Sequence, residues 1–152
     1  CYEYKCNDDS SLHTEDTCGG NCNQCTVISS SNPLLCCDYL SLSFGNITDS
    51  TVEILMSNSM PVYGFQFDLI GDTIFSNTVS GGTASDNGFS VSIANNILIG
   101  FSMTGSYIPS GSSILTIVDV ISLSEPICIQ NIFISDVSGE QINMPEIPIC
   151  SQ

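Results

Sequence analysis

The cysteines are the residues of this chain with the widest choice of chemistry, and most of them are crowded near its beginning. Two stand far downstream, Cys128 and Cys150, and the crowded set is Cys1, Cys6, Cys18, Cys22, Cys25, Cys36 and Cys37. Cysteines at this density form disulfides in oxidising compartments, where they staple segments too small to bury a core. We therefore predict a disulfide-stapled segment over residues 1–37 of a secreted or cell-surface protein.

Zinc binding is the other chemistry that this cysteine spacing allows. Cys22 and Cys25 form a C-x-x-C pair, with Cys18 four residues before it, and zinc sites use such spacings. The acidic, serine-rich composition is that of an extracellular protein, in which the same spacing serves disulfides. We therefore favour disulfides over zinc. A cysteine nucleophile is disfavoured for the same reason, because an oxidised thiol cannot attack a substrate.

The pairing of the nine cysteines is only partly constrained by the sequence. Cys36 and Cys37 are adjacent and cannot easily bond to each other, so they should have different partners. Cys128 and Cys150 are natural partners, although either could reach back to the first segment. Because nine is an odd number, one cysteine must stay free, bond another chain, or pair with a residue outside this sequence.

Catalysis by a histidine or by paired carboxylates finds little support in the sequence. The chain has one histidine, His13, in a polar stretch of the cysteine-rich segment, so a Ser-His-Asp arrangement would have to recruit it from a stapled loop. Its 16 acidic residues would give some carboxylate pair in any compact fold, and no tryptophan is present to stack against a sugar. We therefore predict that the protein is not an enzyme.

The charge balance excludes two classes of partner. The chain carries one lysine, Lys5, and no arginine against 16 acidic residues, for a formal net charge of −15. Proteins that hold nucleic acid or anionic membranes neutralise phosphates with several basic side chains. No apolar run reaches the roughly 18 residues that a membrane-spanning helix needs. The first residues also lack the basic and apolar regions of a signal peptide, so we interpret the sequence as a mature chain.

Two kinds of ligand or modification remain open. Calcium is the most plausible ion, because hard oxygen ligands occur at Asp8-Asp9, Glu15-Asp16 and Asp86-Asn87-Gly88; none of these stretches has the twelve-residue spacing of an EF-hand loop. We therefore expect solvated acidic loops and no cofactor. Asn46 begins the sequon Asn46-Ile47-Thr48 in an expected loop between two strands, and we predict N-glycosylation there.

Residues 38–152 have the pattern of an all-β domain. Apolar residues alternate with serine, threonine and asparagine at the period of two that places one set on one face of a strand. The alternating sets are Leu40, Leu42 and Phe44; Val52, Ile54 and Met56; Tyr63, Phe65, Phe67 and Leu69; Phe89, Val91 and Ile93; and Ile97, Ile99, Phe101 and Met103. Asn95-Asn96 predicts a hairpin turn, since asparagine tolerates positive φ. Turn signals every ten or so residues favour an antiparallel two-sheet sandwich.

Two later segments, residues 114–121 and 127–134, are apolar on both faces or nearly so. A sandwich strand normally buries one face and exposes the other to water. Either a loop or the cysteine-rich segment covers the second face of these strands, or another copy of the protein does, because an exposed apolar patch of this size is a liability on a monomer.

Several segments of this region occur in an order typical of a known domain. They are residues 62–69, 80–91, 100–102, 108–112 and 134–140. Together they resemble the cohesin-type domain, in the divergent form found in secreted proteins of algae, protists and their viruses. The resemblance covers residues 38–143 and implies a jelly-roll-like sandwich of about nine strands, used for contacts between proteins outside cells and without catalysis. Residues 1–37 fall outside it, and no duplicated calcium loop of the dockerin type is present.

These observations lead to one preferred function and one alternative. The preferred function is a structural protein that polymerises into a filament or surface layer, with one copy donating a strand to the next. Candidate donor residues are Thr26, Val27, Ile28, Leu34, Leu35, Ile147 and Ile149. The alternative is an adhesin or cohesin-like module whose loops bind a protein or glycan partner.

Overall fold

The structure is a computed structural model that describes residues 3–6, 12–14, 25–27, 40–142 and 148–151. The chain divides into two compact units, Cys1–Tyr39 and Leu40–Gln152, so the division falls just beyond the predicted boundary after Cys37. Several residues singled out above lie outside the described ranges: Cys1, Cys18, Cys22, Cys36, Cys37, Ile28, Leu34, Leu35, Ile147, and the acidic pairs Asp8-Asp9 and Glu15-Asp16. Predictions that concern those residues stay predictions.

The first unit contains a small antiparallel sheet. Its strands are β1 (Glu3–Cys6), β2 (Leu12–Thr14) and β3 (Cys25–Val27), in the order β2-β1-β3. The register places Tyr4 opposite both His13 and Val27, and Cys6 opposite Cys25. Thr26 and Val27, two of the candidate donor residues, therefore pair with a strand of their own unit.

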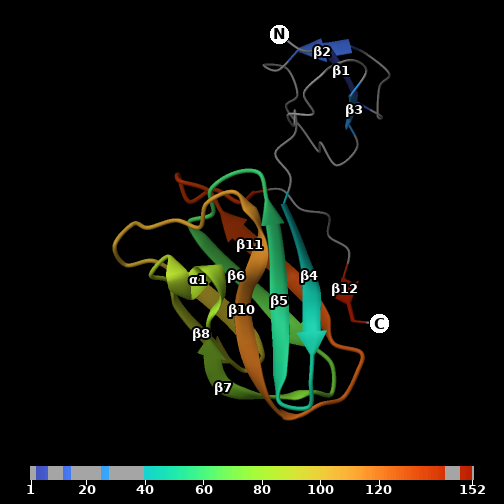
Figure 1. The fold of residues 1–152 in the computed structure, drawn as a ribbon, viewed down its shortest axis with the longest axis vertical. Helices are drawn as coiled ribbons and strands as arrows, with labels where there is room; N and C mark the ends of the chain where they lie inside the picture. Colours follow the sequence, from blue (N-terminus) through green and yellow to red (C-terminus); the bar gives the residue numbers. More distant parts are fainter. Residues whose placement is uncertain (1–2, 7–11, 15–24, 28–39, 143–147, 152) are drawn as a thin grey trace. The chain divides into compact units, whose positions relative to one another are not determined.

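The second unit is the predicted two-sheet antiparallel sandwich (Figure 1), and its described residues form nine strands. The four-stranded sheet has the order β4-β5-β10-β7, formed by β4 (Leu40–Ile47), β5 (Thr51–Asn58), β10 (Gly111–Ser122) and β7 (Ile74–Ser80). The five-stranded sheet has the order β12-β11-β6-β9-β8, formed by β12 (Ile149–Cys150), β11 (Cys128–Ser135), β6 (Gly64–Ile70), β9 (Ile97–Phe101) and β8 (Ser90–Ala94).

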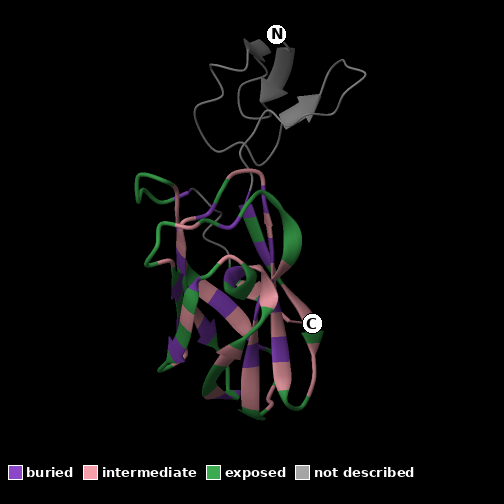
Figure 2. Ribbon diagram, turned by 60° about the vertical axis from the view of Figure 1, so that its left-hand side comes forward, coloured by how far each residue is buried: buried purple, intermediate pink, exposed green. Residues whose placement is uncertain are grey.

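The core lies between the two sheets and follows the predicted alternation on most strands. Strand β5 is the clearest case, because Val52, Ile54 and Met56 are at most 2% exposed while the residues between them are half-buried. Figure 2 shows the same alternation of buried and exposed residues along the strands. In the five-stranded sheet the ring of Phe65 stacks on Phe67 and Phe89, with centroids 6.1 and 6.0 Å apart.

The turn between β8 and β9 confirms the hairpin predicted from Asn95-Asn96. Both asparagines have positive φ, 50° and 63°, and Ala94 pairs with Ile97 across the turn. Two consecutive positive φ angles define the tight turn whose twist matches that of the flanking strands. The two asparagines are therefore enough to determine this turn, without contacts from distant parts of the chain.

One short helix, α1 (Gly82–Asp86), was not expected from the sequence. It follows β7 and packs beside β10 (Figure 1). Thr83 Oγ1 donates a hydrogen bond of 3.2 Å to the Ile114 carbonyl. Gly82 lies so close to the Leu115 carbonyl that a Cβ atom there would overlap it, and its φ of 72° also favours glycine.

The position of α1 bears on the prediction that β10 is apolar on both faces. Leu115 and Val118 are fully buried, whereas Ile114 and Ile117 are half-buried. The chain itself therefore shields part of the second set, but the element beside β10 is the helix α1 and not the loop or the cysteine-rich segment that the sequence suggested. Ile121, near the end of β10, remains 69% exposed. Within the described residues, no helix is long and apolar enough to cross a membrane.

Candidate protein-binding face

The outer surface of the five-stranded sheet carries a row of apolar side chains on β9. Ile97, Ile99 and Phe101 are 41%, 37% and 45% exposed, while Leu98 is fully buried. Gly100 is also buried, because the Phe65 ring occupies the place where a Cβ atom would stand. The alternating set predicted for this segment therefore faces solvent, and Leu98 supplies the core contact.

Two further large side chains extend this row across the sheet. Gln66 of β6 pairs with Ile99 on one side and with Phe133 of β11 on the other, and Phe133 is 43% exposed. Ile70, at the end of β6, is also 43% exposed. We call the set Ile70, Ile97, Ile99, Phe101 and Phe133 the apolar face.

The neighbouring edge strand leaves the β9 row accessible. Opposite Phe101, Ile99 and Ile97, strand β8 places Ser90, Ser92 and Ala94. These small side chains cannot cover the large ones beside them. A flat partner surface could therefore reach the β9 row from the side of β8 as well as from above.

A β-bulge in β11 orients Phe133 toward this surface. The register with β6 shifts between Gln130 and Phe133, and Asn131 has a φ of 50°. The extra residue places Phe133 outward and Ile134 inward, where Ile134 is fully buried. Asn131 Nδ2 also donates a 2.6 Å hydrogen bond to Asp68 Oδ2. Bulges commonly re-aim side chains in this way beside functional surfaces.

The strands that carry the apolar face contain few of the acidic residues of the sandwich. Residues 40–142 contain nine acidic residues and no basic one: Asp49, Glu53, Asp68, Asp72, Asp86, Asp119, Glu125, Asp136 and Glu140. Of these, Asp68 alone lies on the three strands that carry the apolar face, β6, β9 and β11, and none lies on the neighbouring strand β8. Like-charge repulsion between two copies is therefore small where this face meets the same face of another copy.

The outer surface of the four-stranded sheet has a different chemistry. It contains an open groove of about 390 Å³ over β4, β5 and β10. Ser41, Ser57 and Ser112 form one row across it, and the hydroxyls of Ser57 and Ser112 lie in hydrogen-bond contact. Leu55, Met56 and Ile114 form the apolar part of its lining. The residues that line the groove include no acid or base, so it offers no proton-transfer group.

The predicted glycosylation site lies in a strand and not in the expected loop. Asn46 lies within β4, which continues to Ile47, so it is not a loop residue. Glu53 explains this extension, because its carboxylate lies beside Gly45 and its Oε2 accepts a 2.9 Å hydrogen bond from the Asn46 N–H. The Asn46 residue is exposed, and its glycosylation stays a prediction.

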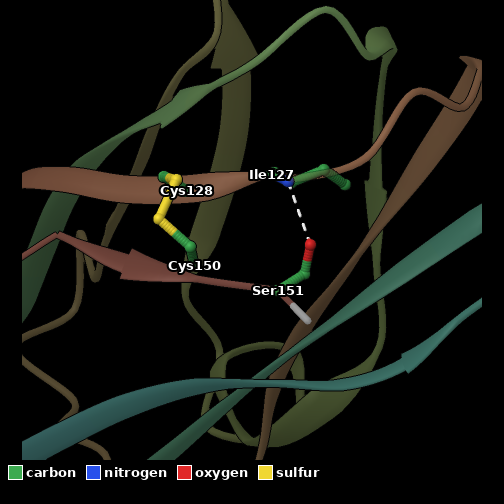
Figure 3. Close-up of a disulfide and its surroundings, with 4 residues drawn as sticks. All are labelled: Ile127, Cys128, Cys150 and Ser151. Carbon is green, nitrogen blue, oxygen red and sulfur yellow. Dashed lines mark hydrogen bonds between the residues drawn. A yellow bond between two sulfur atoms is a disulfide. The ribbon is translucent and has the colours of Figure 1, made fainter.

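Cys128 and Cys150 form the disulfide that their positions suggested (Figure 3). The bond joins directly paired residues of β11 and β12. Ile149, a candidate donor residue, lies in β12 and pairs with Ile129 of the same chain. In this structure, β12 therefore completes the sheet of its own sandwich.

The predicted ion ligands of the sandwich do not converge on a site. Asp86 is exposed at the end of α1, and Asn87 Nδ2 donates a 2.7 Å hydrogen bond to the Thr83 carbonyl. Among the residues that the structure describes, no three His, Cys, Asp or Glu side chains are grouped to hold a metal ion. Calcium binding by the acidic pairs before residue 17 lies outside these residues.

One acidic side chain has a clear structural role. Asp136 follows β11, and its Oδ1 accepts hydrogen bonds from Ser138 Oγ at 2.7 Å, Ser138 N at 2.8 Å and Glu140 N at 3.0 Å. The Ser138 side-chain hydrogen bond, with the backbone N–H groups of this turn, holds the pKa of Asp136 below its usual value. The carboxylate thus fixes the turn after β11, near the end of the strand that carries Phe133.

Comparison with known proteins defines the class of fold. The nine-stranded sandwich is of the cohesin type. A solved structure with this fold is the non-cellulosomal cohesin from the hyperthermophilic archaeon Archaeoglobus fulgidus, which is 18% identical, with a TM-score of 0.52 over 73% of this chain and 88% of that one. No protein-family model and no curated protein matches the sequence. The comparison therefore establishes the fold.

The apolar face was not recognised from the sequence, although one signal for it was present. The segment Ile97-Leu98-Ile99 is apolar on both faces, just as the two later strands are. One face of β9 carries three large apolar residues, Ile97, Ile99 and Phe101, and the other carries Leu98. Alternation alone therefore assigns the first set to the core. The fully buried Leu98 and the position of Phe65 against Gly100 show that the other face of β9 is buried.

Proposed function

We propose that this chain is a non-enzymatic extracellular structural protein that assembles with copies of itself into a filament or surface layer. The observation that carries the proposal is the apolar face. Five large apolar side chains, each at least 37% exposed, lie together on the surface that bears one acid. Monomeric proteins rarely leave such patches uncovered, and larger ones mark interaction sites.

A second copy is the partner that best fits this face. The sandwich has no basic side chain with which to attract an acidic partner or to pair with its own acids. Contact between two copies is therefore favourable where acids are scarce and apolar area is large. Bringing the apolar faces of two copies together satisfies both conditions and leaves the other acids of the sandwich in water. Because each face then meets its own equivalent, this contact closes a pair of copies, and a second, head-to-tail contact extends the pairs into a filament.

Two features support the extracellular location. The Cys128–Cys150 disulfide is of a kind that persists in oxidising compartments. The exposed sequon at Asn46 suits modification in a secretory pathway. Strand donation by residues of the cysteine-rich unit is a further part of the proposal, since a donated strand extends a filament in one direction.

Imaging combined with sizing tests the proposal. The full chain, produced with its disulfides, is measured by light scattering over a concentration series and imaged by negative stain. We expect the mass to rise with concentration and ordered filaments or sheets to form. A monomer that persists at every concentration, with no ordered material in the images, would contradict the proposal.

A protein-binding module is the second candidate, and the charge distribution favours it. Residues 40–142 carry nine acidic side chains and no basic one, so their charge is complementary to that of a basic partner. In this case the chain stays monomeric alone and binds a basic protein with an affinity that falls as salt is added. The concentration series above distinguishes the two functions, because a pure binding module does not gain mass by itself.

A further inference from the structure

The two tyrosines of the second unit lie against each other. The other aromatic residues of this unit are all phenylalanines, seven in number. Tyr63 and Tyr107 are far apart in the sequence, yet their ring centroids are 5.4 Å apart and their ring planes are tilted by 34°. The fold therefore brings the only two phenols of this unit into direct contact.

The backbone holds both tyrosines in place beside each other. Val62 and Ile108 form an antiparallel bridge, in which Val62 N donates a 2.9 Å hydrogen bond to the Ile108 carbonyl and Ile108 N donates a 2.8 Å hydrogen bond to the Val62 carbonyl. Tyr63 follows Val62 and Tyr107 precedes Ile108, so the two tyrosines lie opposite each other next to this bridge. Side chains of such flanking pairs stand close together. Tyr63 N also donates a 2.9 Å hydrogen bond to the Ser135 carbonyl.

The phenol pair is accessible from solvent, although the bridge beside it is not. Tyr107 is 46% exposed and Tyr63 is half-buried, whereas Val62 and Ile108 are buried. An exposed ring changes its rotamer within picoseconds to nanoseconds. The Tyr107 ring can therefore turn the carbon beside its hydroxyl toward the equivalent carbon of Tyr63. Two phenols held in this way are the reactants of an oxidative coupling.

We propose that Tyr63 and Tyr107 are the site of an intramolecular tyrosine cross-link, formed when a peroxidase and hydrogen peroxide act on the protein. Each phenol loses one electron and one proton, and the peroxide takes up both electrons and both protons to become two molecules of water. The two phenoxyl radicals form one carbon–carbon bond between the ring positions next to their hydroxyls. The hydrogen on each of these carbons moves to the phenolic oxygen, which restores both hydroxyls.

Proximity favours coupling within one chain over coupling between chains. Two reactants that a fold holds side by side react in an effectively unimolecular step, which avoids the entropy cost of an encounter. A radical on Tyr107 therefore meets Tyr63 of its own chain first. The product ties the segment before β6 to the segment before β10, and it survives the reducing agents that open the Cys128–Cys150 disulfide. This cross-link goes beyond the proposed function and does not depend on contact between copies.

The test treats a dilute mixture of normal and heavy-isotope-labelled full chains with a peroxidase and hydrogen peroxide. A protease that cleaves after acidic residues separates the two tyrosines, because Asp68, Asp72 and Asp86 lie between them. After reduction of the disulfides, mass spectrometry should find a joined pair of peptides that contain Tyr63 and Tyr107, share one isotope label and lack two hydrogen atoms. Joined pairs of mixed label alone would overturn the inference, as would oxidised chains in which no peptide pair joins these two tyrosines.

Two matched variants separate the phenol chemistry from the packing of the rings. Tyr63→Phe and Tyr107→Phe each retain a ring at the contact and remove one hydroxyl. Both should melt at the wild-type temperature before treatment, and neither should form the joined peptides after it. Formation of the same cross-linked product by either variant would contradict the inference. These readouts concern single chains, so a negative result here leaves the proposed assembly untouched, and a failure to assemble leaves the cross-link untouched.

Discussion

The two sheets of the sandwich have similar inner faces and different outer faces. Phe67 and Leu69 of β6 and Val52 and Ile54 of β5 are all fully buried, so both sheets contribute to one core. Outside, the five-stranded sheet presents the apolar face, while the four-stranded sheet presents a groove with a row of serines. The fold therefore requires apolar side chains only on the inner side of each sheet. The outer residues are free to specify a partner.

The largest loss of stability is expected from substitutions on the inner faces of the sheets, which are apolar in both. Phe67→Ala should lower the free energy of unfolding by about 3–5 kcal/mol, because it leaves a cavity between well-packed strands. Ile54→Ala, on the other sheet, should cost about 2–5 kcal/mol for the same reason. Chemical denaturation measures both. A cost near zero for either variant would show that its sheet does not share the core.

The next largest loss of stability is expected from removing the disulfide at the edge of the five-stranded sheet. The disulfide joins residues 22 apart in sequence, and a closed loop of this size stabilises the folded state by about 3 kcal/mol. The double variant Cys128→Ser, Cys150→Ser should lose this amount in denaturant titrations. A loss as small as that of a surface substitution would mean that β12 is held mainly by the half-buried Ile149 and by the hydrogen bonds between Ser151 and Ile127.

A smaller effect is expected at the bulge that orients Phe133. Asn131→Ala removes the hydrogen bond to Asp68 and places a Cβ-bearing residue of lower left-handed propensity at a φ of 50°, which should cost about 1 kcal/mol of stability. Asn131→Gly is the matched control, because it removes the same hydrogen bond and accepts the backbone conformation. Equal losses for both would assign the whole effect to the hydrogen bond.

The smallest effect is a pH dependence at the turn after β11. The pKa of Asp136 is lowered in the folded state, so its stabilisation is fully present above the unfolded pKa of about 4 and is lost as the pH falls through the lowered value. Melting temperatures of wild type and Asp136→Asn should therefore converge in acid. A constant difference across the pH range would show that the carboxylate charge has no role.

Much of the fold follows from the sequence because its signals are local. The alternation of Val52, Ile54 and Met56 predicts β5, and the consecutive asparagines Asn95-Asn96 predict the hairpin with the observed positive φ angles. Each depends on residues within one strand or turn. The order of strands is of the cohesin type, which the sequence could indicate only by resemblance.

The candidate site was less predictable because it depends on contacts between distant residues. Which face of β9 is buried depends on Phe65, far back in the chain, filling the space above Gly100. The continuation of β4 through Asn46 depends on the reach of Glu53 from the next strand. The bulge at Asn131 shows its effect only when β11 pairs with β6. Patterns within one segment contain none of this information.

The most direct measurement compares one substitution on each outer face. Ile99→Asp places a charge in the middle of the apolar face, and Ser43→Asp places the same charge on the groove of the four-stranded sheet. Both positions are exposed, so both variants should fold. Losing the burial of one isoleucine should weaken association by about 1.5–3 kcal/mol, which is about ten- to a hundredfold in the dissociation constant.

Light scattering across a concentration series determines that constant for both variants and for the wild type. The account predicts that Ile99→Asp shifts assembly to much higher concentration and that Ser43→Asp assembles as the wild type does. Equal assembly by Ile99→Asp and wild type, or a loss confined to Ser43→Asp, would contradict the claim that copies meet through the apolar face.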